Sequence, residues 1–430
     1  SSRYRLTVYT VYAAYARSCY SFAKFGNGIG LMELSARGSV AGEEDIGEVF
    51  ILGAVYSGNG GAVPQIEGSF DWIAEGEGPQ AEEFRSYRLE AARLTAAACR
   101  LGRYCINEEE IPLLSLPDLL GGTHLITRAD TGKPAATYAT QFLYHDSAET
   151  PLTDVMTLLD EQNMPFTLLS AGNAYSVGGN FSTGGAVFAE EALCMQSTLH
   201  LSLRRAAKMA EENGVAAPRW AKPTVDAAGK PWQVYIPELG AVLSPRVEIF
   251  RTGPEDGFAF LERPLQVAFV ITTAMPTCNP EADYPIDAPE DIEEYHRIVE
   301  AKIAAALEVA MQLKSQVLVV PELGCGWQGN DPRIIGERLA SVISSRFPTA
   351  FSEVHFVGDE VFLMSCSRVE HDIAGSRNSQ SFADTILDAN SGMLDPQMLD
   401  GPSPDSRARH VSDELDAPSP APRPRARHVS

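Results

Sequence analysis

The sequence has little positive charge and no long apolar run. Its 430 residues hold 34 Lys and Arg against 57 Asp and Glu, which gives a formal net charge of -23. A protein of this charge repels a polyanion at long range, so broad electrostatic binding of nucleic acid is excluded. No segment reaches the roughly 20 apolar residues of a membrane-spanning helix. We therefore expect no direct DNA contact and no membrane partner.

The seven cysteines lack the spacing of a metal site or a redox motif. The chain has no CxxC pair and no His at zinc-ligand spacing from a cysteine. Such a pattern is typical of a reducing compartment, where most thiols serve as small apolar side chains. We therefore expect an intracellular protein, without distinguishing nucleus from cytoplasm, and neither a metal nor an organic cofactor.

Length and composition predict a globular protein with polar appendages. Hydrophobic residues make up 44% of the chain and charged residues 21%, which is enough apolar material for a sizeable core. Buried strands rich in Val and Leu alternate with helical patterns. This order predicts an α/β layer fold with a mixed or parallel sheet.

The stretch 168–203 is the one around which the chain is organised. Apolar residues at 166–169 predict a buried strand, and a glycine-rich loop then leads into a helical pattern; the loop glycines are Gly172, Gly178, Gly179, Gly184 and Gly185. Such a loop offers backbone N–H groups to a phosphate. Glu190 and Glu191 follow about one helical turn later, and a carboxylate close to phosphate has a raised pKa. The pair therefore suits a group that holds or donates a proton.

A second glycine-rich loop follows another predicted strand, at 317–320. The segment PELGCGWQGNDP, at 321–332, precedes a predicted helix at 334–343. The glycines alone are more often a tight turn, but the Asn-Asp-Pro after them favours a binding site. Since sheets of this class bind nucleotides at strand ends, we expect the two loops to grip one diphosphate from both sides.

Periodicity predicts the other elements of the chain. Helices are expected at 80–104, 153–159, 186–210 (closing at Gly214) and 289–313, and strands at 136–144, 267–273 and 353–357, with a turn-rich piece at 117–134. Near the N-terminus we expect a helix with an aromatic face at 9–20, a strand at 51–55, and glycine turns at 26–30 and 57–61. Residues 1–78 form an extension of unknown role.

The C-terminal composition shifts to Ser, Asp, Pro and Arg. RARHVS occurs twice, at 407–412 and 425–430. Residues 402–430 cannot bury enough apolar surface to order themselves, and we interpret 361–430 as a low-complexity, disordered tail. A kinase or partner motif in the repeated sequence is the alternative interpretation.

Both glycine loops resemble those of the microbial-type poly(ADP-ribose) glycohydrolases, whose catalytic domain is a macrodomain. The first loop, at 178–191, reads GGN, then eight residues, then AEE. This pattern is similar to that family's three glycines followed by Gln-Glu-Glu, except that Asn180 replaces the third glycine and Ala189 replaces the glutamine. The second loop has the family's order of GCG, an aromatic residue and Asn-Asp-Pro. The family's ribose-packing aromatic corresponds to Gln328, so Trp327 beside it is our candidate for that role.

The resemblance implies a macrodomain-like, three-layer α/β/α fold with a central mixed sheet over 79–360. It implies hydrolysis of ribose–ribose O-glycosidic bonds in poly(ADP-ribose), or in ADP-ribosylated proteins, by a monomer that releases ADP-ribose. Glu191 would act as general acid and then as base, and Glu190 would orient ribose hydroxyls. The implied substrate-binding residues are Asn173, Gly178, Gly179, Asn180, Gly324, Cys325, Gly326, Trp327, Gln328 and Asn330, with Arg251 a weaker candidate.

Other interpretations stay open. With Ala189 and Gln328 changed, the domain could instead be a non-catalytic module that binds ADP-ribose. Two adjacent Glu residues near a helix start are also explained by the helix dipole. A metal-dependent nucleotide hydrolase is disfavoured, because the sequence has no His or Asp cluster. We interpret Cys325 as a small loop residue and not a nucleophile, and His200 and His296 as exposed.

Overall fold

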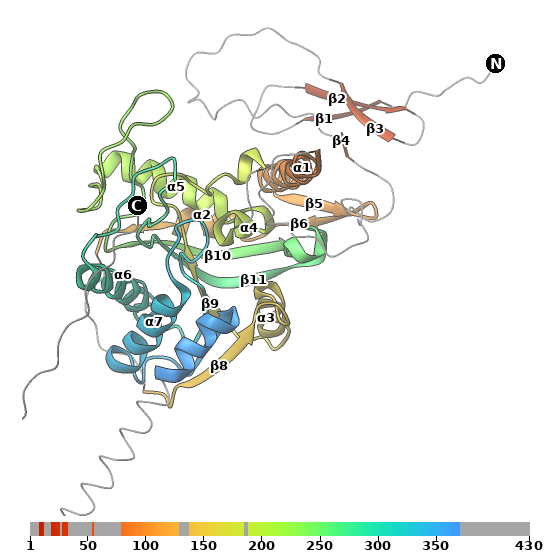
Figure 1. The fold of residues 1–430 in the computed structure, drawn as a ribbon. Helices are drawn as coiled ribbons and strands as arrows, with labels where there is room; N and C mark the ends of the chain where they lie inside the picture. The colour runs from red at the N-terminus through yellow and green to blue at the C-terminus, as the bar shows by residue number, and fades with distance from the viewer. Residues whose placement is uncertain are drawn as a thin grey trace, which may run out of the picture. The chain divides into compact units, whose positions relative to one another are not determined.

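The computed structural model describes residues 79–128, 137–184 and 188–369, and four short strands nearer the N-terminus (Figure 1). The four strands pair in sequence order into an antiparallel sheet, and their bounds are β1 (Val8–Tyr12), β2 (Cys19–Phe25), β3 (Gly28–Met32) and β4 (Ala54–Val55). The helix expected at 9–20 is therefore wrong: Val, Tyr and Thr favour strands. Part of the turn expected at 26–30 belongs to β3. The turn at 57–61 and the tail from 370 onward lie outside the described residues.

A seven-stranded mixed sheet forms the centre of the main domain, in the order β7-β10-β11-β9-β12-β13-β8. The strands are β7 (His124–Ile126), β8 (Gln141–Asp146), β9 (Phe166–Ala171), β10 (Ala241–Arg251), β11 (Phe260–Thr273), β12 (Val317–Pro321) and β13 (Glu353–Gly358). All neighbours from β11 to β8 run parallel, whereas β10 runs antiparallel to both β11 and β7. The predicted mixed sheet is confirmed.

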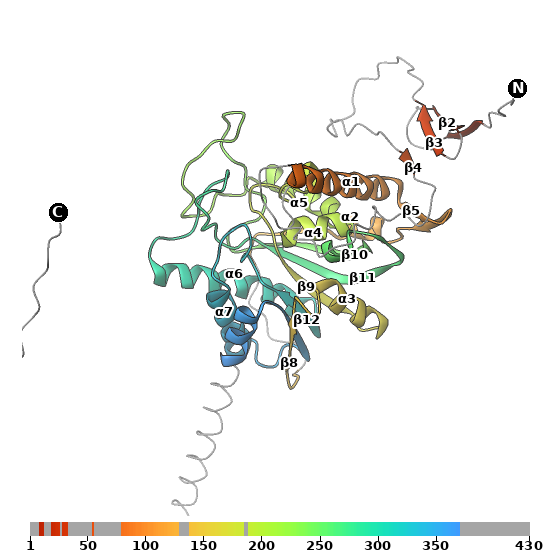
Figure 2. The same ribbon diagram turned by 45° about the vertical axis from the view of Figure 1, so that its right-hand side comes forward.

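Helices cover both faces of this sheet (Figures 1 and 2). Their bounds are α1 (Pro79–Leu101), α2 (Leu116–Gly122), α3 (Leu152–Glu161), α4 (Ala189–Gln196), α5 (Leu199–Asn213), α6 (Ile292–Gln312) and α7 (Pro332–Arg346). One cluster of buried side chains packs helices α1, α2, α3, α4 and α5 against the sheet. A second cluster packs α6 and α7 against it. The domain is thus the expected three-layer α/β/α sandwich. Among the described helices, none has the length and apolar character needed to cross a membrane.

The helix expected at 186–210 is instead two helices, α4 and α5. The chain between them is extended at Ser197, which bridges Ile249 of β10. Thr198 N–H donates to the Glu248 carbonyl (3.0 Å), and Glu248 N–H donates to Thr198 Oγ1 (3.1 Å). Strand β10 therefore supplies the hydrogen bonds that a continuous helix would have made. The predicted end of the helix, Gly214, is confirmed by its left-handed φ of 66°.

Two other boundaries differ from the prediction. The turn-rich piece at 117–134 contains α2 and β7, and the Glu248 carboxylate accepts the N–H groups of Leu114 and Ser115 just before α2. Residues 360–369 are helical and bury Phe362 and Cys366 completely in the cluster with α6 and α7. The tail therefore does not begin at 361, because this segment supplies core side chains.

Helix α1 packs directly on the end of the first glycine loop. Arg85 Nε donates to the Thr183 carbonyl (3.4 Å) and Arg88 Nε to the Gly184 carbonyl (3.0 Å). A Cβ added at Gly184 would lie 2.5 Å from the Arg85 carbonyl oxygen. Glycine at this position therefore lets the loop approach the helix backbone.

We expect Gly184→Ala to lower the free energy of unfolding more than Gly214→Ala. Both glycines have positive φ, 69° and 66°, so alanine costs about 1 kcal/mol at either position. A Cβ at Gly214 meets nothing within 4 Å, whereas at Gly184 overpacking adds about 1–3 kcal/mol. Urea unfolding of the two variants measures the difference. Equal losses would contradict the close approach of loop and helix.

Candidate active site

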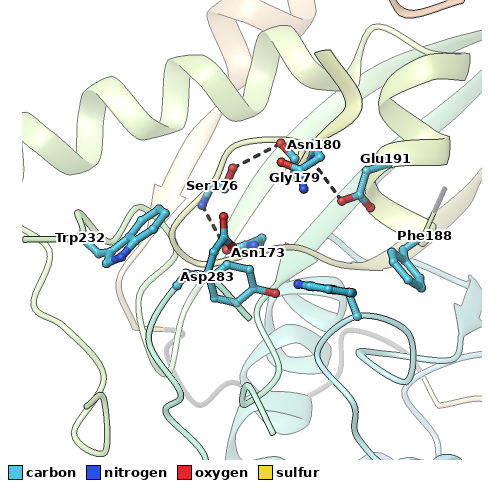
Figure 3. A pocket seen from close by; sticks show the side chains of 10 residues that line it. Asn173, Ser176, Gly179, Asn180, Phe188, Glu191, Trp232 and Asp283 are labelled. Carbon is cyan, nitrogen blue, oxygen red and sulfur yellow. Dashed lines mark hydrogen bonds between the residues drawn. The ribbon is translucent and has the colours of Figure 1, made fainter. Parts of the chain in front are cut away.

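A pocket opens at the edge of the sheet where the parallel strands β9, β11 and β12 end (Figure 3). Loops after these three strands, the start of α4 and the segment before β10 all contribute. The residues that line it are Asn173, Ser176, Gly179, Asn180, Phe188, Glu191, Trp232, Asp283, Tyr284 and Trp327. Carboxyl ends of parallel strands meet at one edge, which is why loops far apart in sequence converge here.

Glu190 is buried beneath the first glycine loop. Its carboxylate accepts hydrogen bonds from Asn173 N–H (2.6 Å), Gly178 N–H (3.0 Å) and the Tyr235 hydroxyl (3.0 Å). Burial, followed by the charge of Glu191, raises the pKa of Glu190, and these hydrogen bonds oppose the shift. Both oxygens are occupied by the protein, and Glu190 does not line the pocket. The structure thus places it beneath the loop that it shapes, and not where it would orient ribose hydroxyls.

Of the two adjacent glutamates, Glu191 is the one that lines the pocket (Figure 3). It is 9% exposed and, among the other described residues, accepts one long hydrogen bond, from Asn180 N–H to Oε1 at 3.3 Å. Burial raises the pKa of Glu191 to about 7, although its backbone hydrogen bonds hold the value down. A carboxyl group with this pKa is partly protonated at neutral pH, so it can donate a proton and then accept one.

The loop in front of Glu191 needs glycine. Gly179 has φ of +53°, and a Cβ there would overlap the Glu191 carboxyl group. Gly178, with φ of +69°, aims its N–H at Glu190 and lies outside the pocket lining. Asn173 Oδ1 accepts the N–H groups of Tyr175 (2.8 Å) and Ser176 (3.1 Å), which closes the first turn. The loop is therefore fixed before any ligand binds.

The second glycine loop is organised by Asn330. This residue is 2% exposed; its Nδ2 donates to the carbonyls of Pro276 (2.9 Å) and Gly324 (2.8 Å), and its Oδ1 accepts the Tyr295 hydroxyl (2.8 Å). Asn330 thus supports the loop from behind. In the described part of the chain, the N–H groups of Cys325, Gly326 and Trp327 donate to no other residue. Consecutive free amides of this kind suit an anion.

The two loops meet, as the sequence predicted. Gln328 Nε2 donates to the Gly172 carbonyl (3.3 Å), so Gln328 bridges the loops. A Cβ on Gly326 would lie 2.6 Å from Phe188 Cδ1, and the Phe188 and Trp327 ring centroids are 5.9 Å apart. Trp327 lines the pocket and Gln328 does not, so the role of Trp327 as the aromatic contact to a ribose stays a prediction.

Several other side chains lie away from the pocket. Arg251 is at the opposite end of the sheet, where its guanidinium covers the Phe260 ring at 4.0 Å. Cys325 is half-buried, and burial raises the pKa of its thiol, which does not suit a nucleophile. His200 is not exposed as expected: its ring packs on Phe181 (4.4 Å), and burial lowers its pKa to about 4. His296 is half-buried, which also differs from the expectation.

Sequence reasoning missed much of the pocket wall. Ser176 and Phe188 flank the recognised motif, but Trp232, Asp283 and Tyr284 come from segments to which the sequence assigned no site residue. At least one whole helix separates these three residues from either glycine loop in the sequence. A local sequence pattern could therefore not show that they lie beside the loops. Within the described residues, no group of three or more His, Cys, Asp or Glu side chains is arranged to hold a metal ion.

This chain is similar to solved structures of bacterial proteins. One is the poly(ADP-ribose) glycohydrolase of Thermomonospora curvata, with 21% identity, a TM-score of 0.50, and coverage of 66% of this chain and 99% of that one. A mutant of the same enzyme matches with the same values. The chain shares the fold of this glycohydrolase. Comparison with protein-family models found no match, and comparison with curated proteins found none either.

We expect Gly179→Ala to damage the site far more than a matched glycine change. The new Cβ would displace the Glu191 carboxyl group, so ligand binding and turnover should fall at least about tenfold. Gly229 also has positive φ, 75°, but a Cβ there meets nothing within 4 Å. Gly229→Ala should therefore retain the affinity for ADP-ribose, measured by calorimetry. Equal affinities for the two variants would contradict the contact between Gly179 and Glu191.

Proposed function

We propose that the α/β/α domain hydrolyses ribose–ribose O-glycosidic bonds in poly(ADP-ribose) and releases ADP-ribose. The observation that carries the proposal is Glu191: a buried carboxyl group with a pKa of about 7, in a pocket between two glycine loops. The shared fold with the glycohydrolase of Thermomonospora curvata supports the proposal. The catalytic domain would span 79–369, because the helical residues 360–369 belong to its core.

The diphosphate of the ligand would bind the amides of the second loop. The N–H groups of Cys325, Gly326 and Trp327 are available there, and they carry partial positive charge without a Lys or Arg. Binding through amides explains how a protein with a net charge of -23 can hold a negatively charged polymer. A polyanion is held by local dipoles while the field of the whole protein repels it only at long range.

The ribose next to this diphosphate would lie against Glu191 and Trp327. Glu191 would protonate the departing oxygen as the glycosidic bond breaks, and the nearby diphosphate would stabilise the oxocarbenium-like centre. The resulting Glu191 carboxylate would then take a proton from the attacking water. Glu190 would contribute indirectly, because it holds the loop that carries Asn180 and Gly179.

The changes from the family pattern leave the proton donor intact. Ala189 is exposed at the first position of α4, and Gln328 bridges the loops from outside the pocket lining. A protein that only binds ADP-ribose would not need a buried acid, so the enzyme is favoured over the binding module. A monomer acting inside the cell remains part of the proposal, as the sequence predicts.

We expect Glu191→Gln to abolish release of ADP-ribose from labelled poly(ADP-ribose). Removing the proton donor should lower kcat by about 10²–10⁴, while Glu212→Gln, on the exposed face of α5, should behave like the unchanged protein. Product release is followed by chromatography, and ADP-ribose binding by calorimetry. Intact polymer with tight binding to the unchanged protein would favour the binding module. Undiminished turnover by Glu191→Gln would exclude Glu191 as the acid.

We expect kcat to fall as pH rises above about 7, because Glu191 must carry its proton to act as the acid. Burial raises its pKa from 4.5 to about 7, so the protonated fraction drops about tenfold per pH unit above that value. The measurement is kcat at saturating polymer across neutral pH, with Glu212→Gln as the control for general charge effects. A kcat that increases through pH 7 would contradict this role.

A further inference from the structure

Two hydrogen-bonding groups in the pocket wall have no partner among the residues that the structure describes. The Tyr284 hydroxyl and the Trp232 indole N–H are both buried and make no hydrogen bond to any described residue. Trp232 lies across the pocket from Glu191 and Phe188 (Figure 3). Buried polar groups are nearly always satisfied, so two such groups on one wall require an explanation.

Tyr284 differs in this respect from other buried tyrosines of the domain. The hydroxyls of Tyr104, Tyr175, Tyr235 and Tyr295 each donate to a protein oxygen at 2.7–3.1 Å, namely Leu261 O, Asp287 Oδ2, Glu190 Oε1 and Asn330 Oδ1. Tyr284 is 5% exposed, like these, and lines the pocket, yet its buried hydroxyl has no hydrogen-bond partner among the described residues. The other buried tyrosine hydroxyls thus have acceptors within the protein. The missing acceptor at Tyr284 therefore indicates that a ligand supplies it.

The wall that carries both groups is rigid. Tyr284 stacks on Tyr175 with a centroid distance of 5.8 Å, and Trp232 packs edge-on against both rings. Tyr175 is fixed by its hydrogen bond to Asp287 (3.1 Å), which also accepts Thr277 N–H at 2.6 Å. The two donors are thus held in place before a ligand arrives, which lowers the entropy lost on binding.

The charge of the pocket limits which group these donors take. Asp283 and Glu191 both line it, and none of the described lining residues is Lys or Arg. A phosphate on this wall would be repelled, whereas a sugar ring offers neutral oxygen acceptors. Burial, and then the charges of Glu191 and Glu190, raise the pKa of Tyr284, so its hydroxyl remains a donor at neutral pH.

We propose that the Tyr284 hydroxyl and the Trp232 indole N–H donate hydrogen bonds to oxygen atoms of a ribose and hold that ring against Glu191. The inference rests on the proposed function, and it adds a second wall to the site that the glycine loops define. These donors stabilise the bound sugar and play no part in proton transfer. They explain why this aromatic cluster contains two polar groups without a partner among the described residues.

The test compares Tyr284→Phe with Tyr104→Phe by ADP-ribose calorimetry, polymer hydrolysis and thermal unfolding. Tyr284→Phe removes a hydroxyl with no internal partner, so we expect Kd to rise about threefold to tenfold while Tm stays the same or increases. Tyr104→Phe loses its bond to the Leu261 carbonyl, so Tm should fall while Kd is unchanged. Trp232→Phe should weaken binding as Tyr284→Phe does.

The outcomes separate this inference from the proposed function. If the unchanged protein hydrolyses the polymer and Tyr284→Phe has the same Kd and KM, the inference is wrong and the function stands. If Tyr284→Phe loses binding and Tm together, its role is structural and the inference is also wrong. If the unchanged protein binds ADP-ribose without cleaving the polymer, the enzyme proposal fails. The Kd of Tyr284→Phe compared with that of the unchanged protein then shows by itself whether Tyr284 contributes to binding. Absence of any ADP-ribose binding would overturn both.

Discussion

The pocket depends on the hydrogen bonds that converge on the buried Glu190 carboxylate. Two backbone N–H groups of the glycine loop and the Tyr235 hydroxyl donate to it. A buried carboxylate is tolerated only when its oxygens are satisfied, and a glycine loop is ordered only when something fixes its amides. Loop and carboxylate therefore stabilise each other. Everything that the loop positions, including the Asn180 N–H at Glu191, follows from this contact.

Two adjacent residues of one helix thus have different environments. Glu190 faces three donors, whereas Glu191 receives one long bond from Asn180 and faces the pocket. Burial raises the pKa of both, but only Glu191 has room for a substrate. When two neighbouring acids have different surroundings, one can have a structural role while the other transfers protons. The same reasoning extends to the tyrosines, since the Tyr235 hydroxyl donates to Glu190 whereas the Tyr284 hydroxyl has no partner among the described residues.

Much of the fold could be predicted because its signals are local. Strands such as β9 and β12 are fully buried and mostly apolar, and the glycines after them mark the loops. The failures occurred where distant contacts override local pattern. Periodicity continued through Ser197, but its bridge to Ile249 of β10 ended the helix. Turn-forming residues at 117–134 still gave α2, because Glu248 accepts the N–H groups that precede it.

The sequence alone determined the two glycine loops, the meeting of strand ends at one edge, and the presence of an acid pair beside them. These features depend on backbone freedom and short-range periodicity, which a sequence displays directly. Only the tertiary structure decided which acid reaches the pocket, because Tyr235, which engages Glu190, is 45 residues away. It also decided that Trp232 and Tyr284 form the facing wall. Their role depends on unpaired polar atoms in a shared cavity, and no pattern along the chain records such an arrangement.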